Sequence, residues 1–141
     1  MRVTILNLQP VTVDRALVRR AARHAARRAD HQHTSVGIAL VDDERITELN
    51  RAHLGRERAT DVLAYQGDDD DDPGYLGDVA IGVETAARQA GEAGRALDHE
   101  VAWLAAHGVL HLLGYDDADA DARQAMMVLQ DQALEAALVG R

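Results

Sequence analysis

The sequence predicts a single α+β domain, in which a small mixed four-stranded sheet is covered by helices around one buried central helix. Three observations predict this class. In several short stretches apolar and polar residues alternate as they do in strands, and the longer stretches between them have helical periodicity. One helical stretch late in the chain is apolar on nearly every side. The hydrophobic fraction of 47% in 141 residues is ordinary for one globular core, and neither an internal repeat nor a long linker divides residues 1–141.

The first half of the chain alternates between strands and helices. Apolar residues occur at every second position or in short β-branched runs at Val3–Leu8 and Ser35–Val41, which predicts two strands. They recur every three to four positions at Asp14–Ala29 and Asp43–His53, which predicts two helices. A strand, helix, strand, helix order follows for this half.

The second half predicts two more strands and then only helices. We expect the strands at Val62–Tyr65 and Leu76–Gly82, and helices at Glu84–Gly94, Asp98–Leu113 and Ala118–Leu138. Asp98 is a residue type that caps helix N-termini, so it is the predicted start of the central helix.

The segment Gly67–Gly74 holds five successive aspartates and Pro73, and it is typical of a solvated loop between two strands. A calcium or magnesium loop is the alternative, although the alternating spacing and turn glycine of such loops are missing. The chain has no cysteine, which excludes disulfides and thiolate metal sites. It shows neither a signal-peptide pattern nor a stretch fit to span a membrane, so we expect a cytoplasmic protein.

Two histidines near the end of the central helix have the spacing of metal ligands. His107 and His111 are four residues apart, so they project from one face of a helix. Asp117 could join them only if the chain turned back, and Gly114 stands where a helix C-cap would allow that turn. Three ligands and an open position are expected of catalytic zinc. Gly108 predicts a close approach to the helix backbone, because glycine inside a helix otherwise costs about 1 kcal/mol.

The block from His107 to Asp117 resembles the signature His-Gly-x-Leu-His-Leu-x-Gly-Tyr-Asp-His of the YbeY family of bacterial metal-dependent endoribonucleases. Two further blocks agree in order and distance, namely Glu48-Leu49-Asn50 with Thr60-Asp61-Val62-Leu63, and Leu76-Gly77-Asp78-Val79. The resemblance extends over about Val36–Gln130, and the N-terminal third agrees in its pattern of elements.

The resemblance implies a zincin-like metal helix and a zinc-dependent endoribonuclease specific for single-stranded RNA. It also implies a role in maturation of the 16S rRNA 3′ end and in ribosome quality control. The implied cofactor is one Zn²⁺ per chain, held by His107, His111 and Asp117. The implied partners are single-stranded or ribosomal RNA and the small ribosomal subunit or its assembly factors, with no DNA and no membrane.

Two positions depart from the family pattern. The family has histidine where this chain has Asp117, and a carboxylate ligand adds negative charge that weakens the metal as a Lewis acid and repels a phosphodiester. Asp116 is a neighbouring alternative ligand. The family arginine near the scissile phosphate corresponds to Leu54, which donates no hydrogen bond. The candidates to replace it are Arg51, Arg56 and Arg58, and a solvated arginine cluster is the structural alternative.

The net charge of −9 does not by itself suggest a nucleic-acid partner, because such partners are bound mainly by neutralising phosphates. The distribution of charge is more informative. Arginines recur every four residues along the first predicted helix, at Arg15, Arg19, Arg23 and Arg27. This stripe is a candidate RNA-binding surface, and a solvated helix face is the alternative.

Two further functions deserve comparison with the ribonuclease hypothesis. The first is a zinc peptidase. Peptidases of the His-Glu-x-x-His type carry their general base directly after the first histidine, where this chain has Gly108, so a peptidase would need a base from elsewhere in the chain. The second is a non-catalytic ribosome-assembly or RNA-binding factor that keeps the fold and has lost cleavage.

Asp78 is a candidate to orient a ligating histidine, by accepting a hydrogen bond from the ring nitrogen of that histidine that does not bind the metal.

Overall fold

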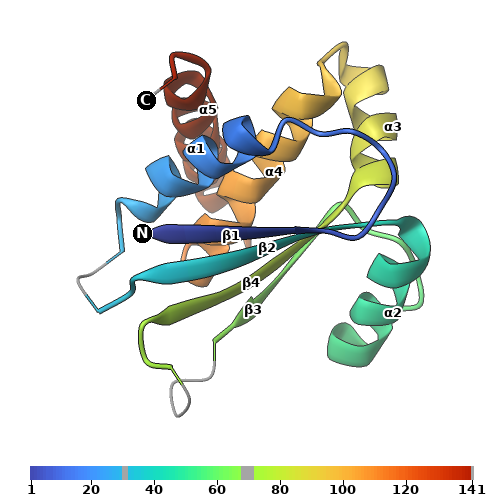
Figure 1. Cartoon of the computed structure of the whole chain (residues 1–141), viewed down its shortest axis with the longest axis horizontal. Helices are drawn as coiled ribbons and strands as arrows, with labels where there is room; N and C mark the ends of the chain where they lie inside the picture. The colour runs from blue at the N-terminus through green and yellow to red at the C-terminus, as the bar shows by residue number, and fades with distance from the viewer. Residues whose placement is uncertain (30–31, 68–71, 141) are drawn as a thin grey trace.

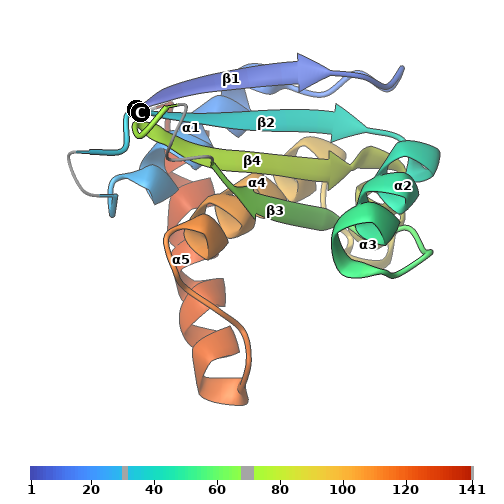
Figure 2. The ribbon, with the colours of Figure 1, turned by 90° about the horizontal axis from the view of Figure 1, so that it is seen from below.

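The protein, described by a computed structural model at residues 1–29, 32–67 and 72–140, contains one four-stranded sheet in the order β1-β2-β4-β3 (Figure 1). The strands are β1 (Arg2–Asn7), β2 (Ser35–Val41), β3 (Val62–Gln66) and β4 (Tyr75–Gly82). β1, β2 and β4 are parallel, whereas β3 pairs with β4 in the antiparallel sense. β1 and β3 are therefore the two opposite edges of the sheet (Figure 2).

Five helices cover the sheet in the described part of the chain. They are α1 (Arg15–Ala26), α2 (Asp43–Leu54), α3 (Val83–Ala93), α4 (Leu97–Leu112) and α5 (Ala120–Leu138). α4 contacts α1, α3 and α5 as well as strands β3 and β4, so it is the buried centre of the domain. α2 lies against the other face of the sheet (Figure 2).

Both faces of the central strands are buried, because successive side chains of a strand point to opposite faces. Ile38, Val79 and Ile81 belong to the large core that the sheet forms with α1, α4 and α5. Val41 and Ala80 belong to a smaller cluster that the sheet forms with α2. This double coverage explains why β2 and β4 are nearly continuous apolar runs in the sequence.

The fold class and all nine expected elements are confirmed, with bounds that differ by at most a few residues. One predicted cap is wrong. α4 begins at Leu97 with Ala96 at the cap position, and no side chain caps it. The Asp98 carboxylate instead accepts a hydrogen bond of 2.8 Å from the backbone N–H of Asp14, at the start of α1. It therefore links the first turns of two neighbouring helices.

The segment expected to be an acidic loop, Gly67–Gly74, lies only partly within the described residues. At its end the backbone N–H of Tyr75 donates to the carbonyl of Asp72 at 3.0 Å, forming the turn that enters β4. Residues 68–71, on which the calcium or magnesium alternative depends, are outside the described part of the chain.

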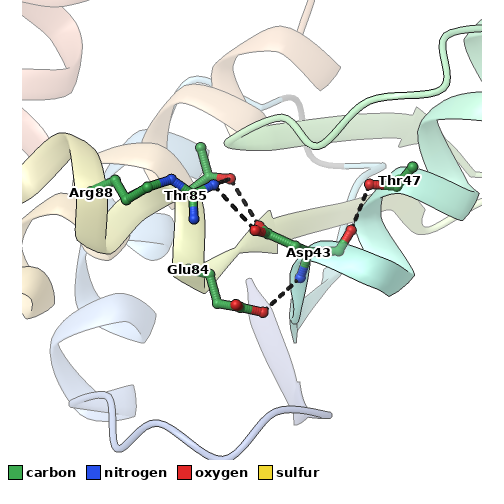
Figure 3. Close-up of polar contacts among 5 residues, drawn as sticks. All are labelled: Asp43, Thr47, Glu84, Thr85 and Arg88. Atoms are coloured by element: carbon green, nitrogen blue, oxygen red, sulfur yellow. Dashed lines mark hydrogen bonds and ion pairs between the residues drawn. The ribbon is translucent and has the colours of Figure 1, made fainter.

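A polar cluster joins the first turns of α2 and α3 (Figure 3). The Asp43 carboxylate accepts hydrogen bonds from the Thr85 hydroxyl at 3.0 Å and from the Arg88 guanidinium at 3.2 Å. The Glu84 carboxylate in turn accepts from the Asp43 backbone N–H at 2.9 Å. Together with the packing of the buried Ile46 against the sheet, this cluster fixes the helix that carries Asn50 and Leu54.

Gly108 allows α4 to pack closely against β4. A Cβ atom at this position would lie 2.4 Å and 2.8 Å from the two γ-methyl carbons of Val79, well inside van der Waals contact. The close approach that the sequence predicts is confirmed. It sets the distance between His107, the preceding residue, and the sheet.

Within residues 1–29, 32–67 and 72–140, none of the helices combines the length and the apolar character needed to cross a lipid bilayer.

Candidate functional site

The two histidines lie in the last turns of α4, and the chain reverses directly after them. Leu113 ends the helix and Gly114 has a φ of 101°, a conformation that favours glycine. The Gly114 N–H donates to the carbonyl of His111 at 3.0 Å, and the Tyr115 N–H donates to that of Leu110 at 3.1 Å. These two bonds define a Schellman motif, so the turn predicted at Gly114 is confirmed.

The reversal brings Asp117 to the same cleft as the histidines. The cleft has a volume of about 320 Å³ and lies between β3, the end of α2 and the end of α4. Its lining includes His107, which is half-buried, and the exposed side chains of His111 and Asp117. Asp116, the alternative ligand, instead accepts a hydrogen bond from the backbone of Ala118 at 3.2 Å.

Gln130 on α5 fixes the orientation of His107. Its side chain is 1% exposed, its Oε1 lies 3.2 Å from the Nδ1 of His107, and its Nε2 donates to the carbonyl of Trp103 at 3.3 Å. Because Nε2 is the donor of this amide, Oε1 is the acceptor and the proton of the imidazole belongs on Nδ1. The second nitrogen, Nε2, then has its lone pair available to a ligand, as in metal-binding histidines.

The donor types fit a zinc ion, although the three side chains are not gathered around one point. Two imidazoles and a carboxylate are a ligand set that zinc accepts, and Gln130 supplies the outer partner that such a histidine needs. Among the described residues, however, no three His, Asp or Glu side chains are close enough to hold one ion. His107, His111 and Asp117 share the cleft, and their role as metal ligands stays a prediction.

Two of the three candidate arginines line the cleft. Arg56 and Arg58 lie in its wall, in the segment between α2 and β3. Arg51 lies on α2 and its guanidinium is 3.9 Å from the Glu57 carboxylate, both side chains being well exposed. Leu54 also lines the cleft and is 56% exposed. An apolar side chain thus stands in the wall where the family pattern has an arginine.

Asn50 holds the arginine segment in place. It is 3% exposed, and its Nδ2 donates to the carbonyl of Arg58 at 3.0 Å. Gly55, with a φ of 68°, ends α2 in the left-handed conformation and starts this segment. The Asn50 Oδ1 atom is buried in the cleft wall without a hydrogen-bond partner in the part of the chain that the structure describes.

Tyr65 provides a second unpartnered polar atom in the cleft wall. Its hydroxyl is buried and lacks a hydrogen-bond partner among the described residues. Burial, together with the negative charge of Asp78, raises the pKa of the phenol to about 12. Its ring lies 4.1 Å from that of His53. Tyr65 is therefore a neutral hydroxyl at neutral pH, able to donate a hydrogen bond.

Asp78 cannot orient a histidine of α4, so that prediction is wrong. It accepts a hydrogen bond from the Tyr75 hydroxyl on the face of β4 opposite to α4. The next residue, Val79, is the one that packs against Gly108 of α4. The alternation of side chains along a strand explains the difference, and Gln130 occupies the orienting position instead.

A second cavity, of about 250 Å³, adjoins the first on the α5 side. The two cavities share Val62, His107 and Asp117 in their linings. The remaining lining of the second cavity has one acidic and one basic side chain, Asp61 and Arg123. Its other members are apolar or aromatic side chains and one amide, namely Trp103, Leu104, Met126, Met127 and Gln130. His107 and Asp117 therefore line both cavities, and we call the two adjoining cavities together the depression, which extends from α2 to α5.

The helix that carries the arginine stripe, α1, lies near β1, at the opposite edge of the sheet from β3 (Figure 2). The Arg19 and Arg23 guanidinium groups lie 3.4 Å from the backbone carbonyls of Val3 and Met1. These contacts protect the open edge of β1, a role for which edge strands often use cations. The members of the stripe, which remain untested as RNA contacts, are Arg15, Arg19, Arg23 and Arg27.

Sequence reasoning did not find Gln130 and Arg123 as members of the site. Gln130 is 23 positions from His107 and lies on another helix, so no local spacing connects them. The only sequence signal for Gln130 is a polar residue on the inner face of an otherwise apolar helical pattern. Arg123 carries no signal that separates it from other surface arginines.

The fold and the cleft together define a class of small α+β domain in which a buried helix presents paired histidines beside an antiparallel edge strand. The chain belongs to the family described as Endoribonuclease YbeY, whose model matches residues 7–137.

Relatives named Endoribonuclease YbeY support this membership. The relative from Pelotomaculum thermopropionicum is 39% identical over 95% of this chain and 95% of its own length. The relative from Prochlorococcus marinus is 43% identical over 72% of this chain, and the match covers 58% of that relative. A solution structure of TM1509 from Thermotoga maritima has the same fold, with a TM-score of 0.63 at 23% identity, covering 96% of this chain and 88% of that one.

Proposed function

We propose that this chain is a zinc-dependent endoribonuclease that cleaves single-stranded RNA. The observation that carries the proposal is the arrangement around His107. Its Nδ1 is fixed by Gln130, its other nitrogen is available for a metal, and His111 and Asp117 line the same cleft. His107, His111 and Asp117 would hold the zinc, which when bound supplies a polarised water and a Lewis acid for phosphodiester hydrolysis.

The other residues of the cleft would bind and orient the RNA. Arg56 and Arg58 would present two positive charges to the phosphodiester. The hydrogen bond from Asn50 to the Arg58 carbonyl limits the movement of the segment that carries them. Gln130 would keep the Nδ1 proton of His107 in place throughout the reaction.

The test is cleavage of a labelled single-stranded RNA, compared with the same sequence as duplex RNA and as single-stranded DNA. We expect His111→Ala to abolish cleavage of the single-stranded RNA. His99→Ala is the matched control, because it removes a half-buried histidine from the same helix, away from the cleft. Cleavage by His111→Ala at the wild-type rate would overturn the proposal.

A non-catalytic RNA-binding or ribosome-assembly factor is the second candidate. It is favoured by Leu54 in the cleft wall and by an aspartate at position 117, because both reduce the positive charge presented to a phosphodiester. RNA binding without cleavage in the same assay, with zinc supplied, would support this candidate over the first.

The proposed biological setting follows from the family. The substrate would be ribosomal RNA, at the 3′ end of the 16S molecule, and the partners would be the small ribosomal subunit or its assembly factors. The cytoplasm would then be the site of action, and zinc would be supplied at one ion per chain. Maturation of 16S rRNA in cells that depend on the His111→Ala variant tests this setting.

A further inference from the structure

Among the described residues that line the second cavity beside His107, Arg123, in the first turn of α5, is the one arginine or lysine. Together with Asp117 and His107, Arg123 lines the α5 side of the depression. Arg56 and Arg58 line the opposite side, near α2. The three arginines therefore flank the candidate metal ligands from two directions.

The charge of the depression depends strongly on Arg123. Among the described residues that line the two cavities, the cations are Arg56, Arg58 and Arg123, and the anions are Asp61 and Asp117. Without Arg123 the positive and negative charges would be equal in number. Since the whole chain carries a net charge of −9, a lining with an excess of arginine is a local exception to its acidic surface.

The guanidinium of Arg123 has no structural task that would explain it. Within the described ranges no carboxylate lies within ion-pair distance of Arg123. Its backbone N–H donates to the Asp119 carbonyl at 2.9 Å, which is an ordinary helical bond. The side chain is exposed, so a phosphate can approach it from solvent.

The rest of this cavity suits the neighbouring nucleotide. Met127 is 39% exposed, and Trp103 is half-buried with its indole N–H held by Asp131 at 2.9 Å. The Arg95 guanidinium covers one face of the Trp103 ring, 4.9 Å from its centroid, so the apolar surface beside which a base can lie is formed by Met127 and the remaining exposed part of Trp103. A single strand of RNA needs both features, a cation for each phosphate and an apolar surface for the bases.

We propose that Arg123 binds the phosphate of the RNA on the α5 side of the cleavage site, while Arg56 and Arg58 bind on the α2 side. This inference rests on the proposed function and names a substrate-binding residue for it. In this chain Arg123 would supply one of the two charges by which the site departs from the family pattern, the missing cation at Leu54 and the added anion at Asp117.

The experiment measures binding of a fluorescent single-stranded RNA oligomer by anisotropy, at several salt concentrations and with a chelator present so that no cleavage occurs. Arg123→Gln is compared with Gln124→Glu, which makes the same change in net charge at the next, exposed position of α5. We expect Arg123→Gln to weaken binding several-fold and to lower the slope of log affinity against log salt by about 0.7. Gln124→Glu should leave that slope at its wild-type value.

Cleavage kinetics give a second readout. We expect Arg123→Gln to raise KM with little change in kcat, because Arg123 binds the substrate away from the reacting atoms. If Arg123→Gln bound RNA with the affinity of the wild-type protein, and both variants had the same slope of log affinity against log salt, the role of Arg123 would be overturned and the proposed function would remain intact. Failure of the wild-type protein to bind RNA both in chelator and with zinc supplied would overturn both.

Discussion

Replacing Gly108 by alanine should destabilise the protein, although alanine is the better helix former. The new Cβ would lie 2.4 Å from one γ-methyl carbon of Val79 and 2.8 Å from the other, against a favourable carbon–carbon distance of about 3.5–4.0 Å. Val79 is fully buried in a central strand, and its branched side chain has little freedom to rotate. The helix or the strand must therefore move.

The magnitude follows from two opposing terms. Overpacking of a well-packed core costs about 1–3 kcal/mol, and the overlap at Val79 places Gly108→Ala at the upper end of that range. The gain in helix propensity from glycine to alanine is about 1 kcal/mol. We expect a net loss of about 2 kcal/mol in the free energy of unfolding.

The assay is urea denaturation followed by far-UV circular dichroism, with Gly91→Ala as the control. Gly91 lies inside α3, and a Cβ atom there would meet nothing within 4 Å. Gly91→Ala should therefore stabilise the protein by about 1 kcal/mol through propensity alone. If Gly108→Ala stabilised the protein as much as Gly91→Ala, the close packing of α4 on β4 would be refuted.

The double variant Gly108→Ala/Val79→Ala tests the cause of the effect. Val79→Ala alone removes both methyl groups that the new Cβ would meet, at a cost of about 2 kcal/mol for the lost burial and the cavity. In the double variant the Cβ of residue 108 fills part of that space. We expect the two costs to be less than additive by about 1–2 kcal/mol, whereas strict additivity would contradict a direct contact.

Three further predictions concern the site and its surroundings. Gln130→Met removes the partner of the His107 imidazole and should lower zinc affinity by about 10- to 100-fold, measured by competition with a chelator; unchanged affinity would argue against an orienting role. Burial raises the pKa of Glu100 above 4.5, so the folded state binds its proton more tightly and stability falls as pH rises from that value through the folded pKa. Glu100→Gln should thus have a higher free energy of unfolding than the wild type in urea titrations at about pH 7, with a smaller gain at about pH 4. The same gain at both pH values would refute a raised pKa of Glu100 in the folded state. Asp117→His should raise zinc affinity modestly, and its combination with Leu54→Arg should raise RNA cleavage; no gain from the double variant would show that these positions do not limit the reaction.

The fold was predictable because its elements have strong local signals. Alternation in the strands and periodicity in the helices place every element, and Gly114 marks the turn after α4 through its own conformational preference. Gly108 is informative for a similar reason, since its cost inside a helix requires a compensating contact. Local physics was sufficient for these features.

The contacts between distant residues were not predictable in the same way. The spacing of His107 and His111 predicts that they share a face, but not that Gln130 of α5 fixes one of them. Asp98 has the chemistry of a cap, yet the packing of α1 against α4 gives its carboxylate another partner. Asp78 was assigned to the wrong face because only strand register decides which residues of β4 point toward α4.

Zinc content is the measurement that tests the central claim most directly. The protein would be purified without a tag and analysed for metals beside His111→Ala, with circular dichroism to show that the variant is folded. We predict close to one zinc per chain in the wild-type protein and its loss in the folded variant. A wild-type protein without zinc, or a variant that keeps it, would contradict a metal site at His107, His111 and Asp117.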